Sequence, residues 1–185
     1  MKTSITSIFI FFSFFTTMLC GQNADTTRVS KPAIKWYKFE EALVLNNQYP
    51  KKKIFIDVYT EWCGWCKKMD ASTFKDSAIV AYMNEKFYPV KFDAERKDTI
   101  TVNGNKYVNS NPNEKRGVHQ IAANLLQGKM SYPSYVFLGE MGNEITVING
   151  FKPAQEFEPV LHYYGDNEFI NMPFSEYRLK FPSRK

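Results

Sequence analysis

The chain has 185 residues, of which 44% are hydrophobic and 16% aromatic, which is enough apolar material for one packed core and favours one domain over two. Its 24 Lys and Arg residues against 19 Asp and Glu residues give a net charge of +5. The basic residues form no dense patch beyond residues 51–53, which precede an apolar run, so we interpret that patch as a solvated loop and expect no nucleic-acid partner.

The N-terminal segment has the pattern of a secretory signal peptide. A basic start, an apolar run over residues 8–15 and small residues near Gly21 are typical of such a signal, and the run is short for a membrane span. We expect residues 1–21 to be removed, leaving a flexible polar leader over residues 22–33 and an exported, periplasmic protein. The alternatives are a membrane anchor through an uncleaved signal and a lipid attached to Cys20.

Helices and strands then alternate along the first half of the chain. Apolar residues at roughly helical spacing predict a helix over residues 34–46. The β-branched and aromatic run 54–59 predicts a buried strand. Two further helices are expected over residues 63–69 and 76–83, followed by a second strand over residues 88–92.

The second half of the chain predicts two hairpins, two helices and an appended segment. Asn103 and Gly104 suit a tight turn, and Pro153 suits the first turn of a helix. The predicted elements are a hairpin over residues 99–108, helices over 114–126 and 153–164, paired strands over 134–138 and 144–148, and a short helix within residues 165–185. Strands that alternate with helices and end in a hairpin predict an α/β fold around a mixed sheet.

Cys63 and Cys66 have the spacing of a working dithiol. They follow a predicted buried strand and open a helix, whose free N–H groups and dipole favour a thiolate over a thiol at Cys63. A thiolate attacks a disulfide, and a second thiol one helical turn away resolves the mixed disulfide. Gly64 and Trp65, which separate the two cysteines, tune the relative stability of the oxidised and reduced forms.

A zinc site and an inert structural disulfide are the alternatives to a redox-active pair. A zinc site needs about four ligands, and only His119 and His162 remain as partners, without metal-like spacing. An inert structural disulfide is the other alternative, although a loop this short gains little from a staple. We therefore expect no metal and no cofactor other than a redox-active Cys63–Cys66 disulfide.

The segment around the dithiol resembles the active-site stretch of the thioredoxin superfamily. The resemblance rests on residues 56–68, which contain Trp62-Cys63-Gly64-Trp65-Cys66-Lys67, and it continues over roughly residues 34–164. Residues 132–138 resemble the family's cis-proline segment, and residues 147–151 resemble the end of its last strand. Residues 67–74 are also similar to the C-terminal thioredoxin-like domain of the bacterial disulfide reductase DsbD and to small exported bacterial thioredoxin-like proteins. The resemblance implies a thioredoxin fold, with a central mixed β-sheet flanked by helices, to which this chain adds a hairpin-bearing insertion and a C-terminal helical extension.

The resemblance also implies a role for each catalytic residue. Cys63 is expected to be the attacking, exposed cysteine and Cys66 the resolving, more buried one. Asp57 matches the family's buried acid, whose pKa burial raises so that it can exchange a proton with Cys66. Lys91 matches the lysine that pairs with this acid. A water-facing Asp57 and an outward-pointing Lys91 are the alternatives.

The same comparison suggests a substrate-binding surface. Pro133 is expected to form a cis peptide bond that lets the Tyr132 backbone pair with a substrate strand, the alternative being an ordinary trans loop proline. Trp62, Gly64 and Trp65 are expected to shape this surface, although Trp62 could instead serve core packing.

Two features depart from the family pattern. Trp65 stands where thioredoxins commonly have proline, which leaves the redox potential open. The long connection over residues 95–115 is either a substrate- or partner-contacting feature or a decorative insertion.

The function expected from these residues is a monomeric thiol–disulfide oxidoreductase. Its partners would be protein thiols and disulfides, and we favour net reduction, which requires electrons from a membrane-bound donor. The alternatives are a disulfide oxidase or isomerase, and a thioredoxin-fold module that binds clients with little turnover.

Overall fold

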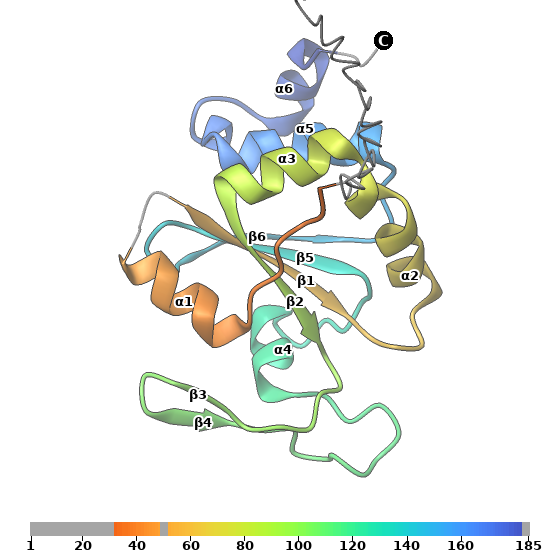
Figure 1. Ribbon diagram of the computed structural model, residues 1–185, viewed down its shortest axis with the longest axis vertical. Helices are drawn as coiled ribbons and strands as arrows, with labels where there is room; N and C mark the ends of the chain where they lie inside the picture. Colours follow the sequence, from red (N-terminus) through yellow and green to blue (C-terminus); the bar gives the residue numbers. More distant parts are fainter. Residues whose placement is uncertain (1–31, 49–51, 183–185) are drawn as a thin grey trace, which may run out of the picture. The chain divides into compact units, whose positions relative to one another are not determined.

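The computed structural model describes residues 32–48 and 52–182 (Figure 1). The predicted signal peptide, Cys20 and nearly all of the predicted leader lie outside these residues. No helix in the described part of the chain is long and apolar enough to cross a membrane.

A four-stranded mixed sheet forms the centre of the fold. Its strands lie in the order β2-β1-β5-β6, with β1 parallel to β2 and antiparallel to β5, and with β5 antiparallel to β6. The strands are β1 (Lys53–Tyr59), β2 (Phe87–Asp93), β5 (Ser134–Leu138) and β6 (Glu144–Asn149), and a separate hairpin is formed by β3 (Ile100–Val102) and β4 (Asn105–Tyr107).

Helices cover both faces of this sheet (Figure 1). They are α1 (Phe39–Gln48), α2 (Gly64–Ala71), α3 (Ser77–Lys86), α4 (Gln120–Leu125), α5 (Ala154–Gly165) and α6 (Phe174–Lys180), with short 3₁₀ turns at Thr73–Lys75 and Glu168–Ile170. In Figure 1, α1 and α4 lie against one face, and α3 and α5 lie against the other. The arrangement confirms the predicted α/β fold with a central mixed sheet.

The alternation of side chains along β1 divides the core into two clusters. Ile54, Ile56 and Val58 pack with residues of α1 and α4, whereas Phe55 packs with residues of α2, α3 and α5. Successive side chains of a strand point to opposite faces, so Asp57, two residues after Phe55, faces α2. Burial of β1 on both faces therefore places a carboxyl group directly beneath the helix that begins after Cys63.

The predicted helix over residues 34–46 is wrong in its first part. α1 begins only at Phe39, because the preceding residues run extended beside β2, where the Tyr37 N–H donates to the Pro89 carbonyl over 2.7 Å. Ile34 is buried in this extended stretch. Apolar residues that line a sheet edge can thus match helical spacing.

The predicted helix over residues 114–126 is also too long. α4 begins at Gln120, and His119 caps it by accepting the Ile121 N–H at Nδ1 over 3.2 Å. The residues before His119 form a loop in which Arg116 has a φ of +68°. Positive φ is incompatible with a right-handed helix, so the helix cannot extend back through this position.

The remaining predicted elements are confirmed. Asn103 and Gly104 both have positive φ, at 51° and 79°, and form the turn between β3 and β4. The segment after α5 forms a 3₁₀ turn and α6, whose Phe174 and Tyr177 rings lie 5.2 and 5.3 Å from that of Tyr163. This extension is held to α5 by aromatic contacts.

Candidate active site

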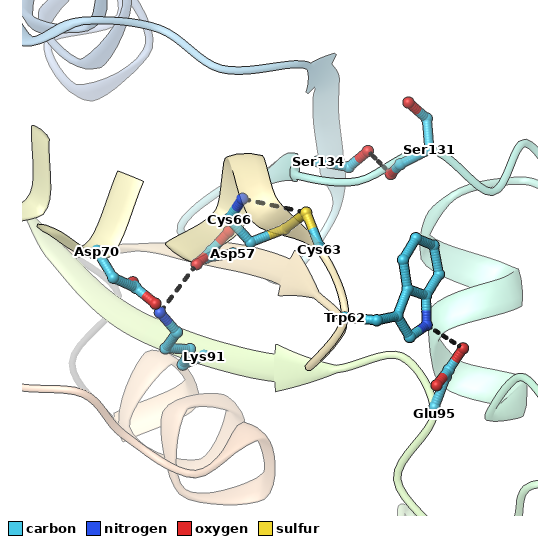
Figure 2. The surroundings of a disulfide bond; sticks show 9 residues. All are labelled: Asp57, Trp62, Cys63, Cys66, Asp70, Lys91, Glu95, Ser131 and Ser134. Atoms are coloured by element: carbon cyan, nitrogen blue, oxygen red, sulfur yellow. Dashed lines mark hydrogen bonds and ion pairs between the residues drawn. A yellow bond between two sulfur atoms is a disulfide. The ribbon is translucent and has the colours of Figure 1, made fainter. Parts of the chain in front are cut away.

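Cys63 and Cys66 form a disulfide at the start of α2 (Figure 2). The Cys63 N–H donates to the Thr60 carbonyl over 3.1 Å, which turns the chain from β1 into the helix. Cys63 is the N-cap residue, and its Sγ accepts a hydrogen bond from the Cys66 N–H at 3.0 Å. The same N–H and the positive end of the helix dipole stabilise a thiolate at Cys63 when the disulfide is reduced.

Both cysteines are buried, which corrects the expectation of an exposed Cys63. Cys63 is 5% exposed and Cys66 is 2% exposed, so Cys63 is only slightly the more accessible of the two. The neighbouring Trp62 and Trp65 are instead 51% and 56% exposed. The side chains around the disulfide, more than Cys63 itself, therefore form the exposed surface at this site.

Asp57 is a buried acid next to the disulfide. It is 1% exposed, and in Figure 2 its carboxylate lies at the Cys66 end of the disulfide. The Lys91 Nζ lies 3.5 Å from the Asp57 Oδ2 and is also paired with the Asp70 carboxylate of α2. Loss of water raises the pKa of Asp57 to about 7, an effect that Lys91 opposes and Asp70 reinforces. The alternatives of a water-facing Asp57 and an unpaired, outward Lys91 are therefore excluded.

The Tyr132–Pro133 peptide bond is cis, as predicted. Pro133 is buried, its carbonyl accepts the Gly150 N–H over 2.8 Å, and the Ser134 hydroxyl donates to the Ser131 carbonyl over 2.5 Å (Figure 2). The Tyr132 backbone N–H and C=O have no hydrogen-bond partner among the described residues. Hydrogen bonds thus hold the residues on either side of Tyr132 in place, and leave the Tyr132 N–H and C=O able to pair with another strand.

Trp62 is a half-exposed ring held by three neighbours. Its Nε1–H donates to the Glu95 Oε1 over 2.8 Å (Figure 2), and its ring lies edge-on to Tyr132 with the centroids 5.9 Å apart. The Arg116 guanidinium carbon lies 4.6 Å from the centroid of the Trp62 ring. Half-exposure excludes simple core packing as the role of Trp62.

Trp65, between the two cysteines, contacts a different set of residues from Trp62. Its ring centroid is 5.4 Å from that of Phe151, and the Lys68 Nζ lies 5.0 and 4.7 Å from these two rings. Gly64 is exposed, and a Cβ at this position would meet no atom within 4 Å. Packing therefore does not require glycine at position 64.

Three residues near the dithiol are not predicted by the sequence pattern. Asp70 lies four residues after Cys66, a helical spacing that could have placed it on the same face. Glu95 begins the insertion over residues 95–115 and Arg116 directly follows it, and no local pattern relates either residue to Trp62. The pattern also places Arg116 in a helix that in fact begins only after it.

The two histidines have structural partners. The His119 Nε2 lies 3.2 Å from the Asp98 carbonyl oxygen, and the His162 Nδ1 lies 3.1 Å from the Asp166 Oδ2. Within residues 32–48 and 52–182, no three His, Cys, Asp or Glu side chains are grouped so that they could hold a metal ion.

Comparison with known proteins identifies the class to which this fold and site belong. The model of the thioredoxin-like domain family matches residues 39–165, and the chain is a member of this family. Among solved structures, one described as a DsbH oxidoreductase aligns with a TM-score of 0.54 at 18% identity, over 79% of this chain and 94% of that one. This structural likeness concerns the fold.

Curated relatives add two more specific likenesses. The thiol:disulfide interchange protein DsbD of Photorhabdus laumondii is 24% identical over 130 residues, which are 69% of this chain and 19% of that protein. The chain thus matches about a fifth of the length of DsbD. The disulfide bond reductase DsbH of Chlamydia pneumoniae is 25% identical over 136 residues, which are 72% of this chain and 74% of that protein.

Proposed function

We propose that this protein is a thiol–disulfide oxidoreductase that reduces disulfides of other proteins in the periplasm. The observation that carries the oxidoreductase chemistry is the position of Cys63 Sγ at the N-cap of α2, where it accepts the Cys66 N–H at 3.0 Å. A sulfur in this position is activated as a thiolate when the disulfide is open. Membership of the thioredoxin-like family supports the same chemistry. The likeness to the disulfide bond reductase DsbH supports reduction as its direction.

The first step joins the protein to its client. The Cys63 thiolate attacks one sulfur of the client disulfide, so that a Cys63–client S–S bond forms and the client S–S bond breaks. The departing client sulfur leaves as a thiolate and takes a proton from water. The unpaired Tyr132 backbone next to Pro133 holds the client segment as an added strand during this exchange.

The second step releases the reduced client. The Cys66 thiol gives its proton to Asp57 and attacks the Cys63 Sγ, which forms the Cys63–Cys66 disulfide and expels the second client sulfur. Because burial raises the pKa of Asp57 to about 7, this carboxyl group exchanges a proton readily near neutral pH. Two electrons have then passed from the protein to the client, and a membrane-bound donor returns them for the next cycle.

Reduction of insulin by the purified mature protein tests the enzymatic proposal. Wild-type protein should precipitate insulin in the presence of a dithiol, and Cys63→Ser should abolish this while it retains the fold seen by circular dichroism. A well-folded wild-type protein without activity would refute the enzyme and leave a client-binding module.

Equilibration with glutathione tests the direction of electron flow. A reductase should have a potential well below that of the oxidant DsbA, and a value near roughly −120 mV would identify an oxidase instead. A Cys66→Ala variant should accumulate client proteins as mixed disulfides at Cys63, and mass spectrometry of these adducts from periplasmic extracts would identify the clients.

A further inference from the structure

A pocket lies beside the exposed face of Trp62, next to the dithiol. Its volume is about 370 Å³, and its walls are Trp62, Glu95, Arg116, Val118, Met130 and Tyr132. Trp62 directly precedes Cys63, and Tyr132 directly precedes the cis-proline. A client segment that pairs with the Tyr132 backbone would therefore place a side chain next to its reacting cysteine in this pocket.

The insertion builds the wall that carries Arg116. Asn109 is 5% exposed, and its side-chain amide donates to the carbonyls of Arg96 and Gly117 over 3.2 and 2.7 Å, so it ties the two ends of the loop together. A Cβ on Gly117 would lie 2.0 Å from the Asn111 carbonyl oxygen, so the loop closes only around a glycine. The loop is thus a built structure that fixes Arg116 against Trp62.

The chemistry of the lining decides which occupant fits. No described residue forms an ion pair with Arg116, whose guanidinium stacks on Trp62, whereas the Glu95 Oε1 accepts the Trp62 indole N–H. A purely apolar side chain would desolvate the guanidinium without satisfying its donors. A lysine would be attracted by Glu95 and repelled by Arg116, but the Glu95 Oε1 already accepts the Trp62 indole N–H, whereas the guanidinium has no ion-pair partner among the described residues. The charge that is free to pair in this pocket is therefore that of Arg116, although Glu95 weakens the attraction for a client carboxylate. A carboxylate accepts the free N–H groups of a guanidinium and tolerates aromatic and methionine walls along its aliphatic stem.

Positive charge on the helix that carries the dithiol agrees with an acidic client. Lys67 and Lys68 are exposed on α2, one and two residues after Cys66, and the Lys68 Nζ lies 5.0 Å from the centroid of the Trp65 ring. Clustered cations at a binding surface steer an acidic segment toward it.

We propose that this pocket recognises clients that carry an Asp or Glu residue beside the reacting cysteine, with Arg116 binding that carboxylate. The proposal rests on the proposed function and gives the insertion a role in client selection. Trp62 and Tyr132 form the aromatic floor of the site, and Glu95 holds the Trp62 ring in place for Arg116 to stack on.

The test compares disulfide-linked synthetic peptides that are identical except for Glu, Gln or Lys beside the cysteine. Single-turnover oxidation of the reduced protein is followed by tryptophan fluorescence. We expect the Glu peptide to react about fivefold faster than the Gln peptide and the Lys peptide to react most slowly. Arg116→Gln should bring the three rates together, Arg116→Lys should keep part of the preference, and Lys115→Gln, which changes the neighbouring exposed cation, should keep all of it.

A second measurement separates binding from redox chemistry. Serine-for-cysteine versions of the peptides are titrated into the oxidised protein, and the Trp62 indole N–H signal is followed by NMR. The Glu version should shift this signal in wild-type protein and not in Arg116→Gln. No shift with any peptide, equal rates for the three peptides in wild-type protein, or a preference that survives Arg116→Gln would overturn the pocket.

Insulin reduction by the same preparations distinguishes the two proposals. Normal insulin reduction without a preference for Glu would overturn the pocket and leave the oxidoreductase standing. A Trp62 signal that responds to the Glu peptide in a protein unable to reduce insulin would support the pocket and refute the enzyme.

Discussion

Replacement of Asp57 by Asn should make the stability of the oxidised protein less dependent on pH. Burial raises the pKa of Asp57 from its usual 3.8 to about 7 in the folded protein. Between these values the folded state keeps a proton that the unfolded chain releases, so the free energy of unfolding falls as pH rises from about 4 to about 7 and then levels off. At about 1.4 kcal/mol for each pH unit, the full loss is about 4 kcal/mol. An asparagine side chain cannot ionise, so the variant escapes this loss.

Urea denaturation of the oxidised proteins between pH 4 and pH 8.5 measures this effect. The variant should gain up to about 4 kcal/mol relative to wild type between the two ends of this range, because any cost of burying the amide is the same at every pH. Glu61→Gln, in the exposed turn before Cys63, is the matched control because it makes the same kind of carboxyl-to-amide change at a position that water reaches. A difference between Asp57→Asn and wild type that stays constant with pH would show that burial does not perturb Asp57.

Two further changes test the packing and the charges around the site. Gly117→Ala should destabilise the protein by about 3 kcal/mol in urea denaturation, because the added Cβ would lie 2.0 Å from the Asn111 carbonyl oxygen. Gly64→Ala, whose Cβ would meet no atom within 4 Å, should be neutral or stabilising. Equal effects of the two changes would contradict the close approach of the backbone at Gly117. Lys91→Met should move the pKa of Asp57 above about 7, because it removes the positive charge 3.5 Å from the carboxylate. NMR titration of the Asp57 carboxyl carbon measures this pKa, and an equal pKa in the variant and wild type would show that Lys91 does not act on Asp57.

The parts of the site that follow from local pattern could be predicted from the sequence. The β-branched and aromatic residues around Asp57 mark β1 as a buried strand, and the family resemblance adds that Asp57 is a buried acid beneath the helix opened by Cys63. The cis bond at Pro133 followed from the family resemblance of its segment. Each of these conclusions depends on residues close together in the sequence.

The parts of the site made by tertiary contacts could not be predicted in this way. Arg116 reaches Trp62 because the Asn109 side chain donates hydrogen bonds to the carbonyls of Arg96 and Gly117 and so closes the insertion. Hydrogen bonds of this kind leave no periodic pattern in the sequence. The sequence of residues 114–126 predicts one helix, but the positive φ of Arg116 places the first of these residues in a loop. Burial of Cys63 likewise depends on residues packed around it and not on its position at a helix start.

The redox potential of the dithiol should depend on the charges that lie near it. The Cys66 N–H stabilises the Cys63 thiolate and so favours the reduced form, which makes the protein a better oxidant. Asp57, Asp70 and Lys91 form a charged group beside the dithiol. When Asp57 is protonated, the charges of Asp70 and Lys91 cancel. When Asp57 is ionised, the group carries one net negative charge, which disfavours a nearby thiolate. The redox potential of any dithiol falls as pH rises, because its reduction takes up protons. Ionisation of Asp57 as pH passes about 7 should lower the potential of this protein further, which makes it a stronger reductant. Equilibration with glutathione at pH 6 and pH 8 should show this extra shift in wild type and its loss in Asp57→Asn, and identical pH dependence in both proteins would show that Asp57 does not set the potential.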